Sequence, residues 1–106
     1  MIRKAFVIRA KPGMAAEYES RHNPIWPELR QALKHHGVRN YSIFLREATN
    51  ELFGYLEVAD EAEFEQIAKT RVCQRWWCFM TEVLVCETTE SPKAKEEMLR
   101  EVFHLD

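Results

Sequence analysis

The sequence lacks the short motifs that mark several common kinds of active site. It has only three glycines in 106 residues, and no glycine-rich loop that could cradle a phosphate group. The patterns H-E-x-x-H, G-x-S-x-G and C-x-x-C do not occur, so metalloprotease, serine hydrolase and thioredoxin-like chemistry have no support. Any site in this protein must use residues outside these motifs.

Cysteine is equally scarce and gives no framework of cross-links. Cys73, Cys78 and Cys86 are an odd number, and their spacing suits neither a disulfide set nor a zinc site. Three reduced thiols are typical of a cytoplasmic protein, which is the location we expect. The apolar run in the N-terminal "MIRKAFVIRAKPG" is also too short for a signal peptide.

Charge of one sign and long hydrophobic runs are missing as well. The net charge of −2 disfavours nucleic acid and anionic membranes as partners. No apolar run approaches the length of a membrane span. What is present is a 46% share of hydrophobic residues, which is enough for one core, so we expect a single domain over residues 1–106.

The first half of the chain predicts a strand and then two helices separated by prolines. Residues 2–10 are rich in β-branched and aromatic side chains and end at a "KPG" turn. A helix then begins near Met14 and should end near His22, because a residue before proline avoids helical backbone angles. The second helix begins with Pro24 or Pro27 in its first turn and stops at Gly37.

The second half predicts a hairpin, a broken helix and a last strand. "VRNYSIFLR" and "ELFGYLEVA" are rich in β-forming residues and are separated by only four residues. Asp60 resembles the start of a capping box, and helical spacing continues to Val83 with a kink expected at Thr70. The tail is ambiguous between helix and strand. We expect a strand over residues 98–105, because it completes the sheet.

This order of elements, β-α-β-β-α-β, predicts an α+β fold of the ferredoxin-like type. It would have a four-stranded antiparallel sheet with the helices on one face. The other face would then need a cover, which favours a homodimer that packs sheet on sheet, as in dimeric α+β barrels.

The stretch "YESRHNPIWPELR" contains the first candidate site. Tyr18 and His22 are four residues apart, so they lie on one face of a helix and can reach one ligand together. Histidine can give and take protons near neutral pH, and His22 lies where the helix ends. The alternative is an ordinary half-buried histidine that is hydrogen-bonded to a backbone carbonyl.

The second candidate site lies in "VCQRWWCFM". Neighbouring helical residues point about 100° apart, so Trp76 and Trp77 cannot both face the middle of one core. The apolar stripe that includes Val72 and Phe79 predicts that Trp76 is the more buried of the two. A flat indole with its N–H donor suits a sugar ring, and Tyr41 could add a phenol. The alternative is plain packing in and beside the core.

Taken together, "RHNPIWPEL", "NYSIFL", "VCQRWW" and "SP…EVFHL" resemble the L-rhamnose mutarotase family over essentially the whole chain. The resemblance implies an isomerase that interconverts the α and β anomers of L-rhamnose, a homodimer, and no cofactor or metal. It matches the proton-transferring histidine to His22 and the substrate-binding residues to Tyr18, Tyr41, Trp76 and Trp77. The loop "ETTESP" departs from the N-P-D-x-S-P pattern of the family, so its contact with the sugar is not implied.

Three other functions remain open from the residues alone. The tryptophans could form the platform of a binding module without catalysis. An oxidative enzyme of the dimeric α+β barrel type would need a flat hydrophobic substrate and a mostly apolar cleft. A structural interaction domain would leave the histidine at the helix end without a role.

Overall fold

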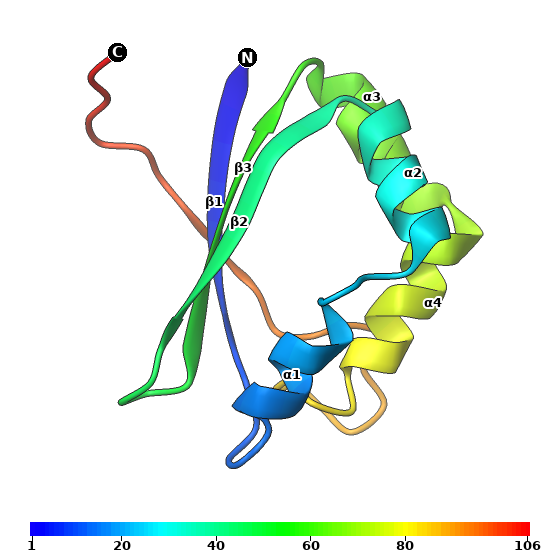
Figure 1. The fold of residues 1–106 in the computed structure, drawn as a ribbon, viewed down its shortest axis with the longest axis vertical. Coiled ribbons are helices and arrows are strands. Elements are labelled where there is room, and N and C mark those ends of the chain that lie inside the picture. The colour runs from blue at the N-terminus through cyan, green and yellow to red at the C-terminus, as the bar shows by residue number, and fades with distance from the viewer.

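The computed structural model describes residues 1–106 and contains one antiparallel sheet with helices packed against one of its faces (Figure 1). The strand order is β2-β3-β1-β4, as expected for a ferredoxin-like fold. The strands are β1 (Ile2–Arg9), β2 (Val38–Arg46), β3 (Glu51–Val58) and β4 (Glu97–Leu99). The helices are α1 (Ala15–Arg21), α2 (Pro27–His35), α3 (Glu61–Glu65), the 3₁₀ helix η1 (Gln66–Lys69) and α4 (Arg71–Met80).

The helices begin where the sequence predicts them to begin. Pro27 is the first residue of α2, where its missing N–H costs no hydrogen bond. The Asp60 carboxylate accepts a hydrogen bond from the Glu63 N–H at 3.1 Å and caps α3. The Thr70 hydroxyl accepts from the Cys73 N–H at 3.3 Å and caps α4, so the expected break at Thr70 is confirmed.

The end of α1 is also confirmed. Arg21 is its last helical residue, and the N–H of His22 still donates to the Glu19 carbonyl at 3.1 Å. The chain then turns through Asn23 and Pro24 before α2 begins. His22 therefore lies at the exit from a short helix, and its side chain is not on a continuous solvated face.

The core lies between the sheet and the helices. Alternate residues of β1 and β3 face the helices and are buried, among them Phe6, Leu52 and Leu56. Gly54 lies under the ring of Phe6, and a Cβ added there would be 2.2 Å from the Phe6 Cζ atom. Glycine at this position lets an aromatic ring lie flat on the sheet.

The opposite face of the sheet has no helix over it (Figure 1). Phe44 on β2 lies beside Phe53 on β3, and Phe53 lies beside Val7 on β1, so these side chains form an apolar band. Phe44 is 61% exposed and Phe53 is 38% exposed. We call this face, with Tyr55 and Leu99, the outer face.

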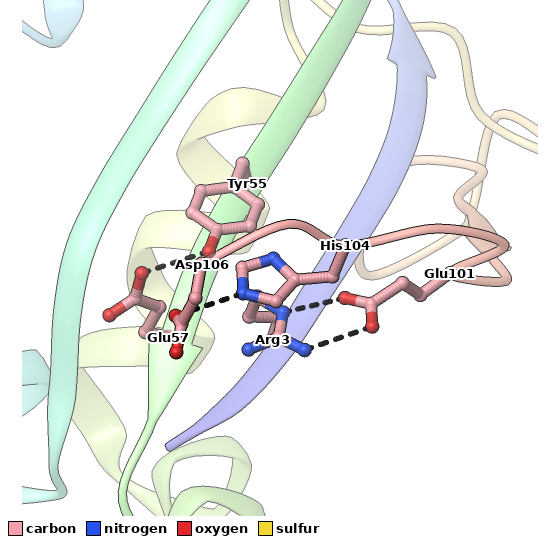
Figure 2. Close-up of polar contacts among 6 residues, drawn as sticks. All are labelled: Arg3, Tyr55, Glu57, Glu101, His104 and Asp106. Atoms are coloured by element: carbon pink, nitrogen blue, oxygen red, sulfur yellow. Dashed lines mark hydrogen bonds and ion pairs between the residues drawn. The ribbon is translucent and has the colours of Figure 1, made fainter.

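The last strand is shorter than predicted, and most of the expected range 98–105 is wrong. β4 has three residues and pairs only with Ala5–Val7 of β1. After Leu99 the chain leaves the sheet on the outer side, where Glu101 forms a two-pronged ion pair with Arg3 at 2.6 and 3.0 Å (Figure 2). The alternation of apolar and polar side chains predicts an extended backbone here. It cannot predict whether a neighbouring strand is present for hydrogen bonding.

His104 belongs to this C-terminal segment. Its Nε2 atom lies 3.3 Å from the Asp106 carboxylate, in the same region as Arg3 and Glu101 (Figure 2). The helices lie across the sheet from it, so His104 does not face the candidate site. No helix of the protein has the length and apolar character that crossing a membrane requires.

Candidate functional site

Tyr18 and His22 lie together, as their spacing predicts. Their ring centroids are 4.3 Å apart, with Tyr18 buried and His22 half-buried. The Nδ1 atom of His22 is 2.9 Å from the backbone carbonyl oxygen of Tyr18. A carbonyl only accepts, so in the neutral ring Nδ1 carries the proton and Nε2 keeps a free lone pair.

Burial lowers the pKa of His22, and the hydrogen bond to the Tyr18 carbonyl opposes this only in part. The imidazole is therefore neutral near pH 7. The backbone hydrogen bond of an ordinary half-buried histidine is present, but it uses only Nδ1. The other nitrogen has no hydrogen-bond partner and can accept a proton from a ligand.

The two tryptophans differ in burial as the helical stripe predicts. Trp76 is 7% exposed, whereas Trp77 is only half-buried. The Trp76 indole meets the His22 ring edge to face, with centroids 5.3 Å apart and planes at 87°. The Lys93 ammonium lies over the Trp77 ring, 4.7 Å from the ring centroid.

Tyr41 comes to the site from the sheet. The pairing of β2 with β3 shifts between Arg39 and Ser42, and Asn40 has a positive φ of 49°. A bulge of this kind re-aims the neighbouring side chain. Tyr41 is 40% exposed as a residue, and its ring packs edge-on against Phe6 at 6.2 Å.

The two phenols are hydrogen-bonding groups rather than proton carriers. Burial raises the pKa of Tyr18 well above its usual value. Tyr41 is 40% exposed as a whole residue, but it lines the hollows, and burial of its phenol there raises its pKa, with smaller contributions from Tyr18, Glu96 and Cys73. Both phenols therefore stay protonated near neutral pH and can donate a hydrogen bond to an oxygen.

All five candidate residues line the same two adjoining hollows. A wide groove of about 1080 Å³ lies between the helices and β2, and a smaller hollow of about 80 Å³ adjoins it over β1. Helical spacing predicts only that Tyr18 lies beside His22, and Trp76 and Trp77 are simply adjacent in the chain. Only the fold brings α1, α4 and β2 to one place.

Two residues of the smaller hollow were missed by the sequence analysis. Lys93 and Glu96 both line it, although no motif or spacing in "KAKEE" predicts a site there. In β4, Met98 pairs with Phe6 and Glu97 with Val7, so alternation places Glu96 on the helix side with Phe6. The sequence did not show that the last strand begins at Glu97, and without that start the side of the sheet on which Glu96 lies could not be predicted.

These features define the class of protein. The sheet order and the one-sided helices are those of a ferredoxin-like α+β domain, and the aromatic hollow with a neutral histidine suits a small polar ligand. An antibiotic biosynthesis monooxygenase shares this fold, with a TM-score of 0.64 at 12% identity over 96% of this chain and 99% of that one.

The family follows from closer matches. The L-rhamnose mutarotase family matches residues 3–105, and the chain belongs to that family. It is 57% identical to the L-rhamnose mutarotase of Opitutus terrae and 52% identical to that of Pectobacterium carotovorum, over the full length of each. A crystal structure of L-rhamnose mutarotase from Formosa agariphila superposes with a TM-score of 0.86 at 33% identity, covering all of both chains.

Proposed function

We propose that this protein is a sugar mutarotase that interconverts the α and β anomers of L-rhamnose. The observation that carries the proposal is the free Nε2 of a neutral His22, placed in a hollow beside two tryptophans. The names of the full-length relatives give the reaction and the sugar. Such an enzyme is an isomerase of carbohydrate metabolism, and its reaction transfers protons while one carbon–oxygen bond breaks and re-forms, with no net oxidation or reduction.

His22 acts on the anomeric hydroxyl. Its Nε2 takes the proton of this hydroxyl, the bond between the anomeric carbon and the ring oxygen breaks, and the ring oxygen gains a proton from water in the hollow. The open aldehyde rotates about its C1–C2 bond, and the same steps in reverse close the ring on the other face. Positioned acid–base catalysis of this kind contributes roughly 10²–10⁴-fold.

The other residues hold the sugar. Trp76 and Trp77 offer apolar surface to the C–H face of the pyranose, and the phenols of Tyr18 and Tyr41 donate to its oxygens. Binding energy from hydroxyls far from C1 leaves the reacting carbon free to rotate. Lys93 and Glu96 are suited to those distant hydroxyls, because one donates and the other accepts hydrogen bonds.

We also propose that the protein is a cytoplasmic homodimer built from single-domain chains of residues 1–106. The support for the dimer is the outer face, whose exposed Phe44 and Phe53 lie side by side with no helix over them. A second copy packing sheet on sheet would bury this band. The reduced state of the three cysteines, Cys73, Cys78 and Cys86, suits the cytoplasm.

The decisive experiment is NMR saturation transfer between the anomers of L-rhamnose, with and without the protein. We expect the protein to accelerate exchange strongly at catalytic concentration. Binding without any gain in exchange would instead support a binding module. If the protein neither binds L-rhamnose nor accelerates its exchange, the assignment of the sugar is wrong.

A further inference from the structure

A closed ring of side-chain contacts surrounds the end of α1. The Arg21 guanidinium lies 4.0 Å above the Phe79 ring centroid, and Phe79 stacks on Trp26 with centroids 5.3 Å apart. Trp26 meets Trp76 edge to face at 5.1 Å, and Trp76 meets His22 in the same way at 5.3 Å. His22 is bonded to Arg21 in the chain, so the ring closes on itself.

Arg21 is the cationic member of this ring, and three of its nitrogens donate hydrogen bonds. Nη1 donates to the backbone carbonyl of Phe79 at 2.8 Å, and Nη2 donates to the Glu82 carboxylate at 3.0 Å. Nε donates to Glu17, one turn earlier on α1, at 2.8 Å. The Arg21 side chain is only 13% exposed, whereas the Glu17 and Glu82 side chains are 48% and 64% exposed, so the bond to the Phe79 carbonyl is the one best shielded from water.

These bonds fix one helix end against another. Those from Arg21 to Phe79 and Glu82 are the only hydrogen bonds that join α1 to the end of α4. A helix of seven residues has little stability of its own, so its position depends on such docking. The next residue after Arg21 is the histidine of the site.

We infer that Arg21 is a positioning residue, which holds the His22 imidazole against Trp76 by fixing the end of α1 to the end of α4. Its guanidinium contacts Phe79 and Glu82, and does not line either hollow. The effect on chemistry is therefore indirect. A displaced His22 would leave Nε2 out of reach of the anomeric hydroxyl, and a misplacement of about 1 Å can cost roughly 10²-fold in rate.

The first test does not depend on activity. The His22 ring protons are followed by ¹H NMR between pH 4 and 9, and are assigned by their loss in His22→Asn. In the wild type, we expect a pKa below the ordinary value of about 6.5. In Arg21→Gln the released ring should gain water, and its pKa should move up toward that value. The groups that share the hollows with His22 stay unchanged, among them Glu19 on α1, Tyr41 on β2, Cys73 on α4, and Lys93 and Glu96 of the C-terminal segment. Arg21→Gln also removes a neighbouring cation, which by itself raises a histidine pKa, so only a rise that is shared by the charge-keeping Arg21→Lys reports release of the ring.

The second test rests on the proposed mutarotase function. In Arg21→Gln we expect kcat for anomer exchange to fall by about tenfold to a hundredfold, with KM within about twofold, because the sugar contacts remain. Arg75→Gln is the matched control. Arg75 also lies over a ring of the same cluster, Trp26 at 5.9 Å, but it makes no hydrogen bond, so kcat and the His22 pKa should not change.

Two further variants keep the inference open to refutation. Arg21→Lys keeps the charge but not the directed three-way contact, so full recovery of kcat and of the His22 pKa would overturn it. If Arg21→Gln does not fold, Glu82→Gln removes one charged partner and should shift both quantities in the same direction by less. If the pKa of His22 is unchanged in Arg21→Gln or Glu82→Gln, the inference is refuted. If the wild-type protein shows no anomer exchange, only the proposed function is refuted.

Discussion

The imidazole of His22 stands edge-on to the indole of Trp76, with ring centroids 5.3 Å apart and planes at 87°. His22 follows the end of α1, and Trp76 lies in the middle of α4. The contact places the imidazole beside an indole that lines the same hollow. In the proposed mechanism it therefore joins the proton-transfer group to the surface that supports the sugar ring.

Replacing His22 by asparagine should remove most anomer exchange while the protein stays folded. The reason is that the imidazole is half-buried at a helix end, so it contributes to the barrier of the reaction more than to the core. We expect a loss of roughly 10²–10⁴-fold by NMR saturation transfer, and a melting temperature close to that of the wild type. Near-normal exchange in the folded variant would refute the assignment.

The rate should fall on the acid side of the pH profile. Burial lowers the pKa of His22, so the neutral base is fully present at pH 7 and is lost as the pH falls through that lowered value. A plot of kcat/KM against pH should therefore have its acid midpoint below about 6.5. The residual rate of His22→Asn should lack this step. A midpoint above pH 7 would contradict the role of His22 as a base.

Replacing each tryptophan by alanine should affect a different property, stability for Trp76 and sugar binding for Trp77. Trp76 is 7% exposed, so Trp76→Ala should cost on the order of 3–5 kcal/mol of stability. Trp77 is half-buried at the hollow, so Trp77→Ala should mainly raise KM. Chemical unfolding and exchange kinetics measured on both variants separate the two effects. Equal losses of stability and of binding would mean that burial does not divide their roles.

Gly54→Ala should disturb the floor of the site from within the sheet. The new Cβ would lie 2.2 Å from the Phe6 Cζ atom, so the ring must move, and Phe6 packs edge-on against Tyr41. We expect a loss of about 1–3 kcal/mol in urea unfolding, together with a higher KM. The added change Phe6→Leu should recover part of the stability by making room. An unaffected single variant would show that the ring relaxes freely.

The outer face should hold two copies together. Sedimentation equilibrium at micromolar concentration should show a dimer for the wild type, because Phe44 and Phe53 need a cover. Phe53→Glu puts a charge in the middle of that band and should give a monomer. Gln66→Glu, on the helix side and exposed, should leave the dimer intact. A monomeric wild type would rule out the proposed assembly.

Several elements could be predicted from the sequence because their causes are local. The predicted features with local causes are the proline at the start of α2, the cap at Asp60, the break at Thr70 and the alternation of β1 and β3, which act through residues close in the chain. The same holds for the pairing of Tyr18 with His22, which needs only one helical turn. The different burial of Trp76 and Trp77 also follows from one helix.

The remaining features depend on residues that are far apart in the chain. Extended backbone was expected to residue 105, but β4 ends at Leu99, because pairing needs a neighbouring strand and the chain leaves the sheet. The place of Tyr41 depends on a bulge in β2, and that of Glu96 on where β4 begins. The contact ring from Arg21 through Phe79 and Trp26 exists only once α1, α2 and α4 pack together. Sequence spacing therefore determined which side chains share an element, and tertiary packing decided which elements meet, since contacts between distant segments form only when a common core is buried.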